Sequence, residues 1–583
     1  MSIFNKKWKV KKSAPAEFFK EFTEFSDVTK QLLWGRGIKT KKEIDKFFSS
    51  NYDEHLHDPY LLKDIKKAAE RILKAINLNE NILIYGDYDA DGVCASTLIK
   101  NALEKLGGNS IEVYIPDRHE NGYGINMEAV ENFIKNGINL MITVDCGSTN
   151  IKEIVFAQKH GIDVVVTDHH QVMDSPDFAF ALINPQRKDD DYPFKGLSGT
   201  AVAFKLTQVL ISEHKNNNRR SSAERLSESP SDGWEKWLLD LVAISIVTDV
   251  MPLQDENRVL LKFGLLVLEK TRRPGLRALI KKARVDINNM DAFTLGFILG
   301  PRLNAAGRME HANLAFDLLN TKDTNEAERL ADELEKLNSE RRKVVAQILE
   351  DLEKKELKNR YAIVEGHGSW PIGVLGIAAG RLADKYNKPT FLYQRKQYTL
   401  VGSARTPQNF NTVTMLASSS LYLEKFGGHA QAGGFTALLE NEENFQDMIL
   451  KITEEYVEKN GKDSILPTVS IDTEIKYEDI NWDLYDELSK FKPFGEKNSP
   501  PVFLLKNVFV SRPQMVGQDG NHFRCYVKDA YGNSKKAIGF NFPATCARIK
   551  EGDKMNILFN LDVDEWNGNR ELSLKLIDIK INL

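Results

Sequence analysis

The sequence predicts an α/β protein with a parallel-sheet lobe, a long connecting helix, a second α/β lobe and a small C-terminal β-barrel. Three observations support this prediction. Residues 60–210 alternate short apolar runs with amphipathic stretches, residues 322–357 are rich in Glu, Lys, Leu and Ala, and about the last 120 residues hold short strand-like runs separated by turns. A chain of 583 residues exceeds the size of one hydrophobic core, so several domains are expected.

The elements follow one another in this order along the chain. Residues 1–50 are predicted to form an N-terminal helical cap, and residues 51–321 the first lobe. A polar stretch within that lobe, 214–233, is punctuated by Pro and Gly and is expected to be a surface insertion or mobile loop. A helix over 322–357 would be exposed and ~50 Å long at ~1.5 Å per residue, which suits a connector.

The remaining residues divide into the second lobe, 358–462, and the barrel region, 463–583. The barrel region holds five or so short strands broken by turns, a pattern that suits a small barrel such as an OB-fold.

The composition is that of an ordinary globular protein, with 42% hydrophobic and 28% charged residues. The net charge of −4 means that any nucleic-acid binding would depend on local basic patches. No basic-plus-apolar leader and no run of 18 apolar residues is found, so neither a signal peptide nor a membrane span is predicted. The cysteines are far apart and lack C-x-x-C spacing, which argues against disulfides and structural zinc and favours the cytoplasm. They are Cys94, Cys146, Cys525 and Cys546.

The predicted strands of the first lobe end in aspartates. The runs are NILIYGD, IEVYIPD, NLMITVDCG and GIDVVVTDHH. Runs rich in Val, Ile and Leu with helices between them indicate buried parallel strands. Ligands of such sheets gather beyond the carboxyl ends of the strands, which is where these acidic residues stand.

Three aspartates, Asp87, Asp89 and Asp91, stand at alternate positions in DYDADG. If the segment stays extended, all three lie on one face. Alone, such a run is more often an Asx turn or a calcium-type loop, although no Glu stands at the twelfth position that an EF-hand requires.

The other strand ends change the balance toward a metal centre. They add Asp145, the Asp168-His169-His170 run and Asp249. Carboxylates with one or two imidazoles suit Mn²⁺ or Mg²⁺, whereas zinc would favour His and Cys. So many negative charges require more than one dication, and a pair ~3.5–4 Å apart is the arrangement that hydrolyses phosphodiesters in line.

Four motifs, DYDADG, VDCG, TDHH and VTDV, resemble those of the DHH phosphoesterase superfamily, in the same order. Longer segments such as YIPDRHENGYGIN, GPRLNAAGRMEHANLAFDLL, FGGHAQAGGF and FKPFGEKNSPPVF resemble its single-strand-specific exonuclease family. The resemblance extends from about residue 60 to the C-terminus. It makes residues 51–321 the DHH catalytic domain and residues 358–462 the DHH-associated domain.

The resemblance implies two divalent cations, Mn²⁺ or Mg²⁺. The implied ligands are Asp87, Asp89, Asp91, Asp145, His169 and Asp249. The catalytic set would be Asp89, Asp91, Asp145, His169 and His170. Asp145 would bridge the two ions, and Asp168 and His170 would orient ligands or contact a phosphate. Asp240 competes with Asp249 for the last place, but it stands in the middle of a predicted helix, and Asp249 matches the motif.

Substrate contacts are also implied by the resemblance. The 5′-terminal phosphate would be held by Arg118, Ser403 and Arg405, although Arg118 alone would be interpreted as a surface arginine. Arg302 and Arg308, predicted in a loop, would hold inner phosphates, and His429 would line the cleft. One departure from the family is Pro371, which follows Trp370 where relatives carry histidine.

Two further features stay open at this stage. The stretch 270–284 holds seven basic residues and no acid, and suits a solvated helix face or a nucleic-acid path about equally. The barrel aromatics Phe523, Tyr526 and Trp566 are stacking candidates, but core positions are favoured for each.

The leading hypothesis is a metal-dependent 5′→3′ exonuclease that degrades single-stranded DNA in repair and recombination. The resemblance implies a monomer that works with a helicase and a single-strand-binding protein. A DHH phosphodiesterase of short oligonucleotides is an alternative, which the length and the C-terminal barrel oppose. A non-catalytic scaffold is another, which the complete ligand set opposes.

Overall fold

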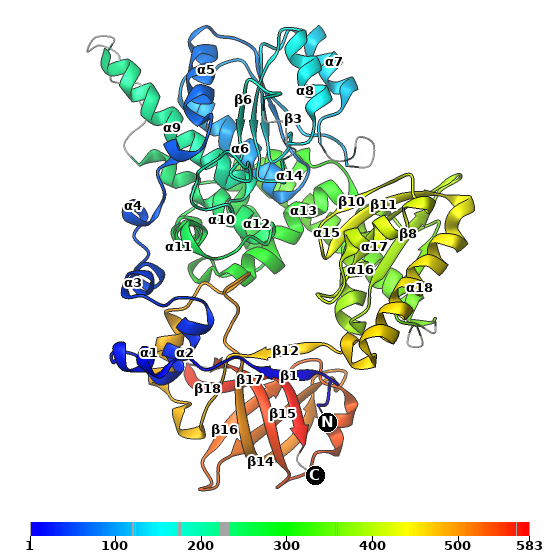
Figure 1. The fold of residues 1–583 in the computed structure, drawn as a ribbon. Helices are drawn as coiled ribbons and strands as arrows, with labels where there is room; N and C mark the ends of the chain where they lie inside the picture. Colours follow the sequence, from blue (N-terminus) through cyan, green and yellow to red (C-terminus); the bar gives the residue numbers. More distant parts are fainter. Residues whose placement is uncertain are drawn as a thin grey trace.

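The computed structural model describes residues 2–118, 122, 124–172, 177–220, 233–355, 357, 360–566 and 568–581. The first lobe, the second lobe and the barrel lie at the three corners of the molecule (Figure 1). Among the described residues, no helix is long and apolar enough to cross a membrane.

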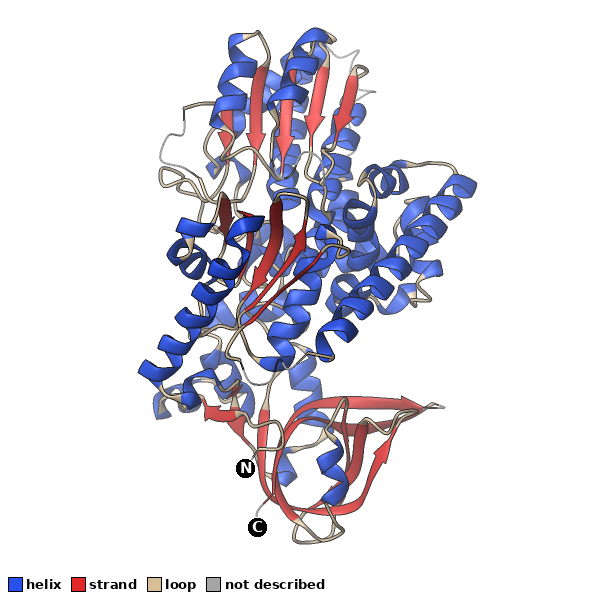
Figure 2. Ribbon diagram, turned by 90° about the vertical axis from the view of Figure 1, so that its right-hand side faces the viewer, coloured by secondary structure: helices blue, strands red, loops and turns tan. Residues whose placement is uncertain are grey.

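The first lobe is built on a five-stranded parallel sheet of order β3-β2-β4-β5-β6. Figure 2 shows its strands pointing the same way, so their carboxyl ends share one edge. Because β3 and β4 flank β2 on opposite sides, the chain reverses direction across the sheet between β2 and β4. Ligands of open α/β sheets bind at such switch points. The strands are β2 (Ile82–Tyr85), β3 (Ile111–Tyr114), β4 (Leu140–Val144), β5 (Asp163–Thr167) and β6 (Ala181–Ile183).

Helices cover both faces of this sheet, which explains the unbroken apolar runs. β2 and β4 are buried along their whole length, whereas β3, at the edge, is partly exposed. One face packs on α5, α6 and α9 and the other on α7 and α8. The helices are α5 (Ile65–Asn77), α6 (Ala90–Lys105), α7 (Met127–Lys135), α8 (Ile151–Lys159) and α9 (Gly199–Arg220). The predicted α/β lobe with buried parallel strands is confirmed.

A helical layer completes the lobe below the sheet (Figure 1). It comprises α10 (Leu239–Thr248), α11 (Asp255–Glu269), α12 (Pro274–Lys282), the π-helical η5 (Thr294–Leu299), α13 (Gly300–Met309) and α14 (Asn313–Asn320).

Two sequence predictions for this part are wrong. Arg302 and Arg308 lie on α13 and not in a loop. Gly307 of this helix is a close-packing site, since a Cβ there would lie 2.5 Å from the Tyr88 carbonyl oxygen. The polar stretch 214–233 begins inside α9, which continues to Arg220 because a surface helix needs no apolar residues there. Residues 221–232 of that stretch lie outside the described residues.

The connector is α15 (Thr324–Glu353), a helix of 30 residues within the predicted 322–357. The prediction that this helix is exposed is wrong for one of its faces. Leu330, Leu334, Val345 and Ile348 bury one face against α12, α13, α14 and α16.

The second lobe has a five-stranded mixed sheet of order β10-β11-β9-β8-β7. Its helix α16 packs on α15, while α17 and α18 cover the other face. The elements are β7 (Ile363–His367), α16 (Ile372–Tyr386), β8 (Thr390–Arg395), β9 (Thr399–Arg405), α17 (Thr412–Ser418), β10 (Lys425–Gly428), β11 (Ala432–Leu438) and α18 (Glu442–Asn460).

The C-terminal strands form a closed barrel, because β14 pairs with both β15 and β17; this confirms the predicted OB-like fold. The elements are β13 (Thr473–Glu474), α19 (Trp482–Ser489), β14 (Phe503–Val516), β15 (His522–Lys528), β16 (Ser534–Gly539), β17 (Lys554–Trp566) and β18 (Asn569–Ile581).

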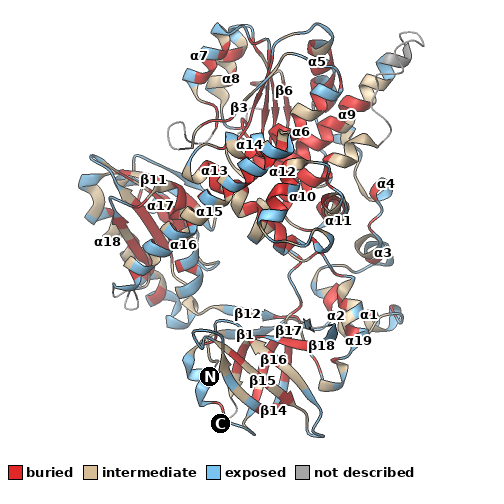
Figure 3. Cartoon of the chain, turned by 180° about the vertical axis from the view of Figure 1, so that it is seen from behind, coloured by how far each residue is buried: buried red, intermediate tan, exposed pale blue. Residues whose placement is uncertain are grey.

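The N-terminal residues pack on this barrel. The prediction of a wholly helical cap is wrong, because this segment also contains a strand. β1 (Lys7–Val10) pairs in parallel with β12 (Thr468–Ile471), and the helices share the apolar core of the barrel through Phe18, Leu33 and Ile44. Figure 3 shows α1 and α2 beside α19. The helices are α1 (Ala16–Glu21), α2 (Asp27–Gly35), α3 (Lys41–Ser49) and α4 (Tyr52–His55).

Candidate metal centre

Acidic side chains converge at the switch point of the first sheet. Asp145 directly follows β4, and Asp87 follows β2 by two residues. The Asp87–Asp91 segment is not extended, so the three carboxylates do not share a strand face. Asp89 is the N-cap of α6 and accepts hydrogen bonds from the Asp91 and Gly92 amides at 2.8 and 3.1 Å. Asp91 lies in the first turn of the helix, so a strand–turn–helix brings the three carboxylates together.

All six predicted metal ligands gather in this region. Within each of three groups the potential ligand atoms lie within 4.8 Å of one another. The groups are Asp87–Asp89–Asp145, Asp91–His169–Asp249 and Asp145–His169–His170. His169 Nε2 lies 3.1 Å from Asp145 Oδ1 and 3.5 Å from Asp249 Oδ2. Asp145 and His169 each belong to two of the groups, so they connect the three groups into one cluster.

The electrostatics of the cluster favour bound cations. Burial, and then repulsion from neighbouring carboxylates, raises the pKa of Asp87, Asp145 and Asp249 well above the usual value. Asp87 Oδ1 is buried and has no hydrogen-bond partner among the described residues. Buried carboxylates are stable only when they are paired, protonated or bound to metal. Five carboxylates and an imidazole are hard ligands that fit Mn²⁺ or Mg²⁺.

Asp168 holds the histidine pair in place from behind. Its Oδ1 accepts hydrogen bonds from the His169 amide at 2.7 Å and from His170 Nδ1 at 2.8 Å, and its Oδ2 from the Ser148 amide at 2.9 Å. Burial opposes ionisation of Asp168, but the hydrogen bond to His170, the charges of both histidines and the Ser148 amide together outweigh it and lower the pKa of Asp168. Burial also opposes protonation of His170, but the hydrogen bond to Asp168 and the charge of that carboxylate raise the pKa of His170 to about 9.

Three residues that the motif analysis missed orient Asp91. Its carboxylate accepts hydrogen bonds from the Gly199 and Thr200 amides, each at 2.8 Å, and from Ser245 Oγ at 2.6 Å. The two amides belong to the N-terminus of α9, which favours an anion. A Cβ on Gly199 would lie 2.5 Å from Asp145 Oδ1, so only glycine fits there. The available signal was GLSGT, a Gly/Ser/Thr-rich start of a helix.

Asp240, the competing ligand, does not belong to the three ligand groups. Its carboxylate accepts from Thr271 Oγ1 at 3.0 Å and pairs with Arg273 Nε at 3.1 Å. It therefore has a structural partner already.

Two arginines of the first lobe, Arg118 and Arg308, lie next to the acidic cluster, and Arg405 of the second lobe lies close to Arg118. Arg118 lies over the Tyr88 ring at 4.8 Å, and Arg308 Nη1 donates to the Gly373 carbonyl, at the start of α16, at 3.0 Å. Burial, and then the charge of Arg118, lowers the pKa of Arg308 to about 9 and lowers the pKa of Arg405. These arginines are close enough to repel one another, an arrangement that a bound phosphate would relieve.

Ser403 shares this location with Arg405. A Cβ on Gly376 of α16 would lie 2.9 Å from Arg405 Nη2 and 3.5 Å from Ser403 Oγ, so both side chains face the first turns of α16. Pro371 is the N-cap of this helix. His429 lies exposed in the turn between β10 and β11.

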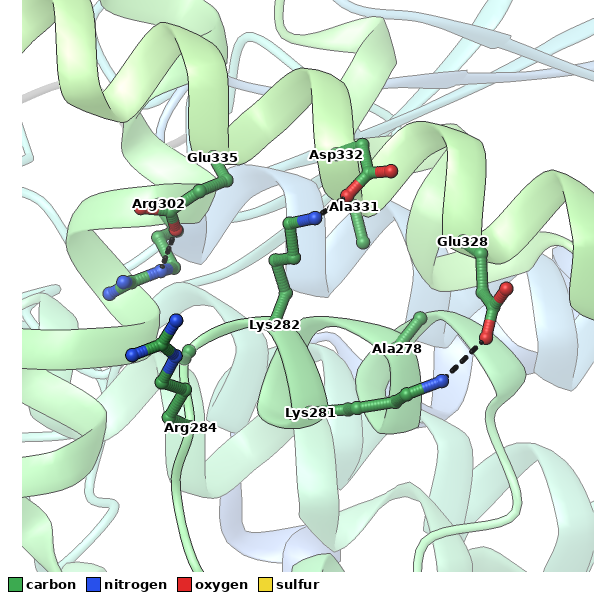
Figure 4. Close-up of a pocket in the computed structure, with 10 residues that line it drawn as sticks. Ala278, Lys281, Lys282, Arg284, Arg302, Glu328, Ala331, Asp332 and Glu335 are labelled. Carbon is green, nitrogen blue, oxygen red and sulfur yellow. Dashed lines mark hydrogen bonds and ion pairs between the residues drawn. The ribbon is translucent and has the colours of Figure 1, made fainter.

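Arg302 is not part of the arginine group. Its Nε pairs with Glu335 of α15 at 2.6 Å (Figure 4). The basic stretch 270–284 is likewise largely engaged within the protein. Its partners are Trp237 for Arg272, Asp240 for Arg273, the Thr271 carbonyl for Arg277, Glu328 for Lys281 and Asp332 for Lys282.

The barrel aromatics differ in position. Phe523 is buried in the barrel core. Tyr526 is half-buried, with Arg512 5.8 Å from its ring centre. The Trp566 side chain lies outside the described residues.

Known protein families match each of the three parts of this architecture. Three family models match: the DHH family N-terminal domain at residues 81–246, the DHHA1 domain at 358–458 and the RecJ OB domain at 471–578. The chain is 34% identical to the single-stranded-DNA-specific exonuclease RecJ of Bacillus subtilis, over 94% of this chain and 67% of that protein. It is 30% identical to RecJ of Salmonella typhimurium, over 94% and 95% of the two chains.

A solved structure supports the same relationship. The crystal structure of RecJ in complex with Mn²⁺ from Thermus thermophilus superposes with a TM-score of 0.81 at 25% identity. The match covers 99% of this chain and 80% of that chain.

Proposed function

Since the chain belongs to the RecJ family of single-stranded-DNA-specific exonucleases, we propose that it degrades single-stranded DNA stepwise from the 5′ end. The reaction uses two divalent cations, Mn²⁺ or Mg²⁺. The ligands are Asp87, Asp89, Asp91, Asp145, His169 and Asp249.

One observation carries this proposal: the complete acidic cluster lies beside arginines contributed by two different lobes. Arg118 comes from the first lobe and Arg405, with Ser403, from the second. A phosphate held among these groups would place the next phosphodiester near the carboxylates. A site that holds a chain end measures from that end, and this favours an exonuclease over an endonuclease.

The chemistry divides between the cations and the protein. When bound, the two cations would supply a hydroxide from water and neutralise charge on the scissile phosphate. The protein keeps the ligands in place through the α9 amides on Asp91 and through Asp168 on His170. His170 donates its Nδ1 proton to Asp168, whose hydrogen bond and charge favour the protonated ring. The proton on Nε2 can therefore be donated to a phosphate oxygen. Arg308 and Arg118 orient the phosphate.

On this proposal, residues 51–321 form the catalytic domain, 358–462 the domain that supplies the end-binding groups, and 463–583 the single-strand-binding barrel. The enzyme would act as a cytoplasmic monomer in DNA repair and recombination. A helicase would supply its single strands, and a single-strand-binding protein would accompany them.

A substrate panel tests the proposal. Single-stranded DNA, the matching duplex and single-stranded RNA are incubated with Mn²⁺, Mg²⁺ or EDTA, and Asp145→Asn runs beside the wild type. We expect cleavage of the single-stranded DNA only, abolished by EDTA and reduced at least ~100-fold by the substitution. Cleavage of dinucleotides alone, or activity that survives EDTA, would overturn the proposal.

A further inference from the structure

Two phenylalanines form an exposed, flat apolar surface on the helical layer of the first lobe. Phe293 is 60% exposed and Phe297 72% exposed. Their rings stack with centroids 4.9 Å apart and an interplanar angle of 24°. Single exposed apolar residues need no explanation, but an aligned aromatic pair offers a π-face to a ligand.

The local backbone directs this pair outward. Asp291 Oδ1 accepts from the Thr294 amide at 2.8 Å and from Thr294 Oγ1 at 2.7 Å, at the start of η5. Gly296 and Gly300 let the helix pack closely on α10. A Cβ on Gly296 would contact Val247, and a Cβ on Gly300 would contact Thr248. The phenylalanines are left on the side away from α10. A π-helical turn such as η5 occurs frequently at functional sites.

The helix that carries this pair and the helix on which it packs, α10, both lead to the metal centre. α10 ends at Asp249, and η5 continues directly into α13, which carries Asn304 and Arg308. Asn304 Oδ1 accepts from the Ala90 amide of the DYDADG motif at 2.9 Å. Arg308 follows Phe297 by eleven positions, or ~16 Å of helix. At ~3.4 Å or more per nucleotide, that distance corresponds to at most about five nucleotides.

Cations accompany the aromatic pair. Arg302 Nη1 donates to the Ile298 carbonyl at 2.6 Å and its Nε pairs with Glu335, so this guanidinium lies along the turn that carries Phe297 but is already neutralised. Arg284 lines the same pocket of about 570 Å³, on the same side as Arg302 (Figure 4). Among the described residues Arg284 forms no ion pair with a carboxylate, and its charge is available to a phosphate.

We propose that Phe293 and Phe297 are a base-stacking platform for the single strand that approaches the metal centre, with Arg284 beside its backbone. The inference rests on the proposed function and specifies where the strand is held. Aromatic stacking next to basic side chains is the general mode of sequence-independent single-strand binding. Paired bases in a duplex do not offer their faces, so the platform favours single strands.

The test separates substrates that reach the platform from those that do not. kcat and KM are measured for a 5′-phosphorylated trinucleotide and a 12-mer with wild type, Phe293→Ala/Phe297→Ala and Phe297→Trp. The control is Tyr398→Ala, which removes an aromatic that is 71% exposed on the second lobe. We expect the double variant to raise KM for the 12-mer ~10-fold with kcat nearly unchanged. The trinucleotide should be cleaved normally, and Phe297→Trp and Tyr398→Ala should resemble wild type.

A second readout measures stacking directly. 2-Aminopurine is placed at successive positions of the 12-mer and its fluorescence is recorded in EDTA. One position within about five nucleotides of the 5′ end should be quenched by wild type and not by the double variant. Equal KM values for the 12-mer, or equal losses on both substrates, would overturn the platform. A defect seen only when a partner protein is added would also overturn it, because the pair would then be a protein-docking surface. If wild type cleaves no single strand, the proposed function itself fails.

Discussion

At the scale of single residues, the centre depends on positions where no side chain fits. Gly199 lies against Asp145, which allows its own amide and that of Thr200 to reach Asp91. Gly92 lets α6 start against Asp87, since a Cβ on Gly92 would lie 2.5 Å from the Asp87 carbonyl oxygen. The sequence motifs identified the carboxylates but not these glycines. Glycines in such segments are usually interpreted as turns, and close packing is visible only in three dimensions.

Gly199→Ala is expected to reduce exonuclease activity ~100-fold, because the methyl group would displace Asp145 from its ligand position. The fold should persist, as the change adds one methyl group. Activity and the melting temperature would be compared with Gly35→Ala, where the nearest atom is 3.6 Å from the added Cβ. Wild-type activity in Gly199→Ala would show that this approach is unimportant.

Lys262 is expected to make stability depend on pH. Its ammonium donates to the Phe48 carbonyl at 3.1 Å. Burial, and then the nearby charge of Arg258, lowers the pKa of Lys262 from 10.5 to about 8. The unfolded chain therefore binds this proton more tightly. The resulting destabilisation is complete below pH 8 and disappears as the pH rises through 8 toward 10.5.

Lys262→Met should therefore raise the melting temperature at pH 7, and the gain should disappear near pH 10. The exposed Lys336→Met is the matched control. A gain of equal size at both pH values would contradict this explanation.

At the scale of elements, strands and long helices were predictable and helix–helix packing was not. The Val- and Ile-rich runs became β2, β4 and β5 because helices bury both faces of the sheet. The segment predicted as a loop is the helix α13, whose Gly307 and Gly300 pack closely on Tyr88 and Thr248. For α15 the composition suggested exposure, although one face is buried. The buried face can be identified only from the positions of the neighbouring helices α12, α13, α14 and α16.

Leu334→Ala on α15 is expected to destabilise the protein by about 2–5 kcal/mol, because Leu334 is fully buried in the core of the first lobe. Lys336→Ala, two positions further on the exposed face, should change stability by less than about 0.5 kcal/mol. Chemical denaturation measures both. Similar values for the two variants would mean that α15 is a solvated rod, as composition alone suggests.

At the scale of the whole molecule, function depends on contacts between parts that are distant in sequence. Arg118 and Arg405 meet across the two lobes, and the sequence pattern alone carries no information on that distance. The barrel is joined to the first lobe in a similar way. Arg258 of α11 donates to the carbonyls of residues 47, 490, 491, 492 and 493, at 2.8–3.4 Å.

Arg258→Met is expected to cost about 3 kcal/mol or more, since it leaves several carbonyls without their donor. Calorimetry should then resolve separate transitions for the barrel and the first lobe. Arg258→Lys, which has fewer donors, should fall between wild type and Arg258→Met. A single transition at the wild-type temperature in Arg258→Met would show that this arginine does not couple the two parts.

The central claim is that the chain holds a 5′ end and cuts next to it with metal. The most direct test follows one single strand labelled at its 5′ end and the same strand labelled at its 3′ end, with Mn²⁺. We predict that the 5′ label leaves first as a mononucleotide, while the 3′ label passes through a ladder of shortening strands. Early release of the 3′ label, or internal fragments from both strands, would contradict the account.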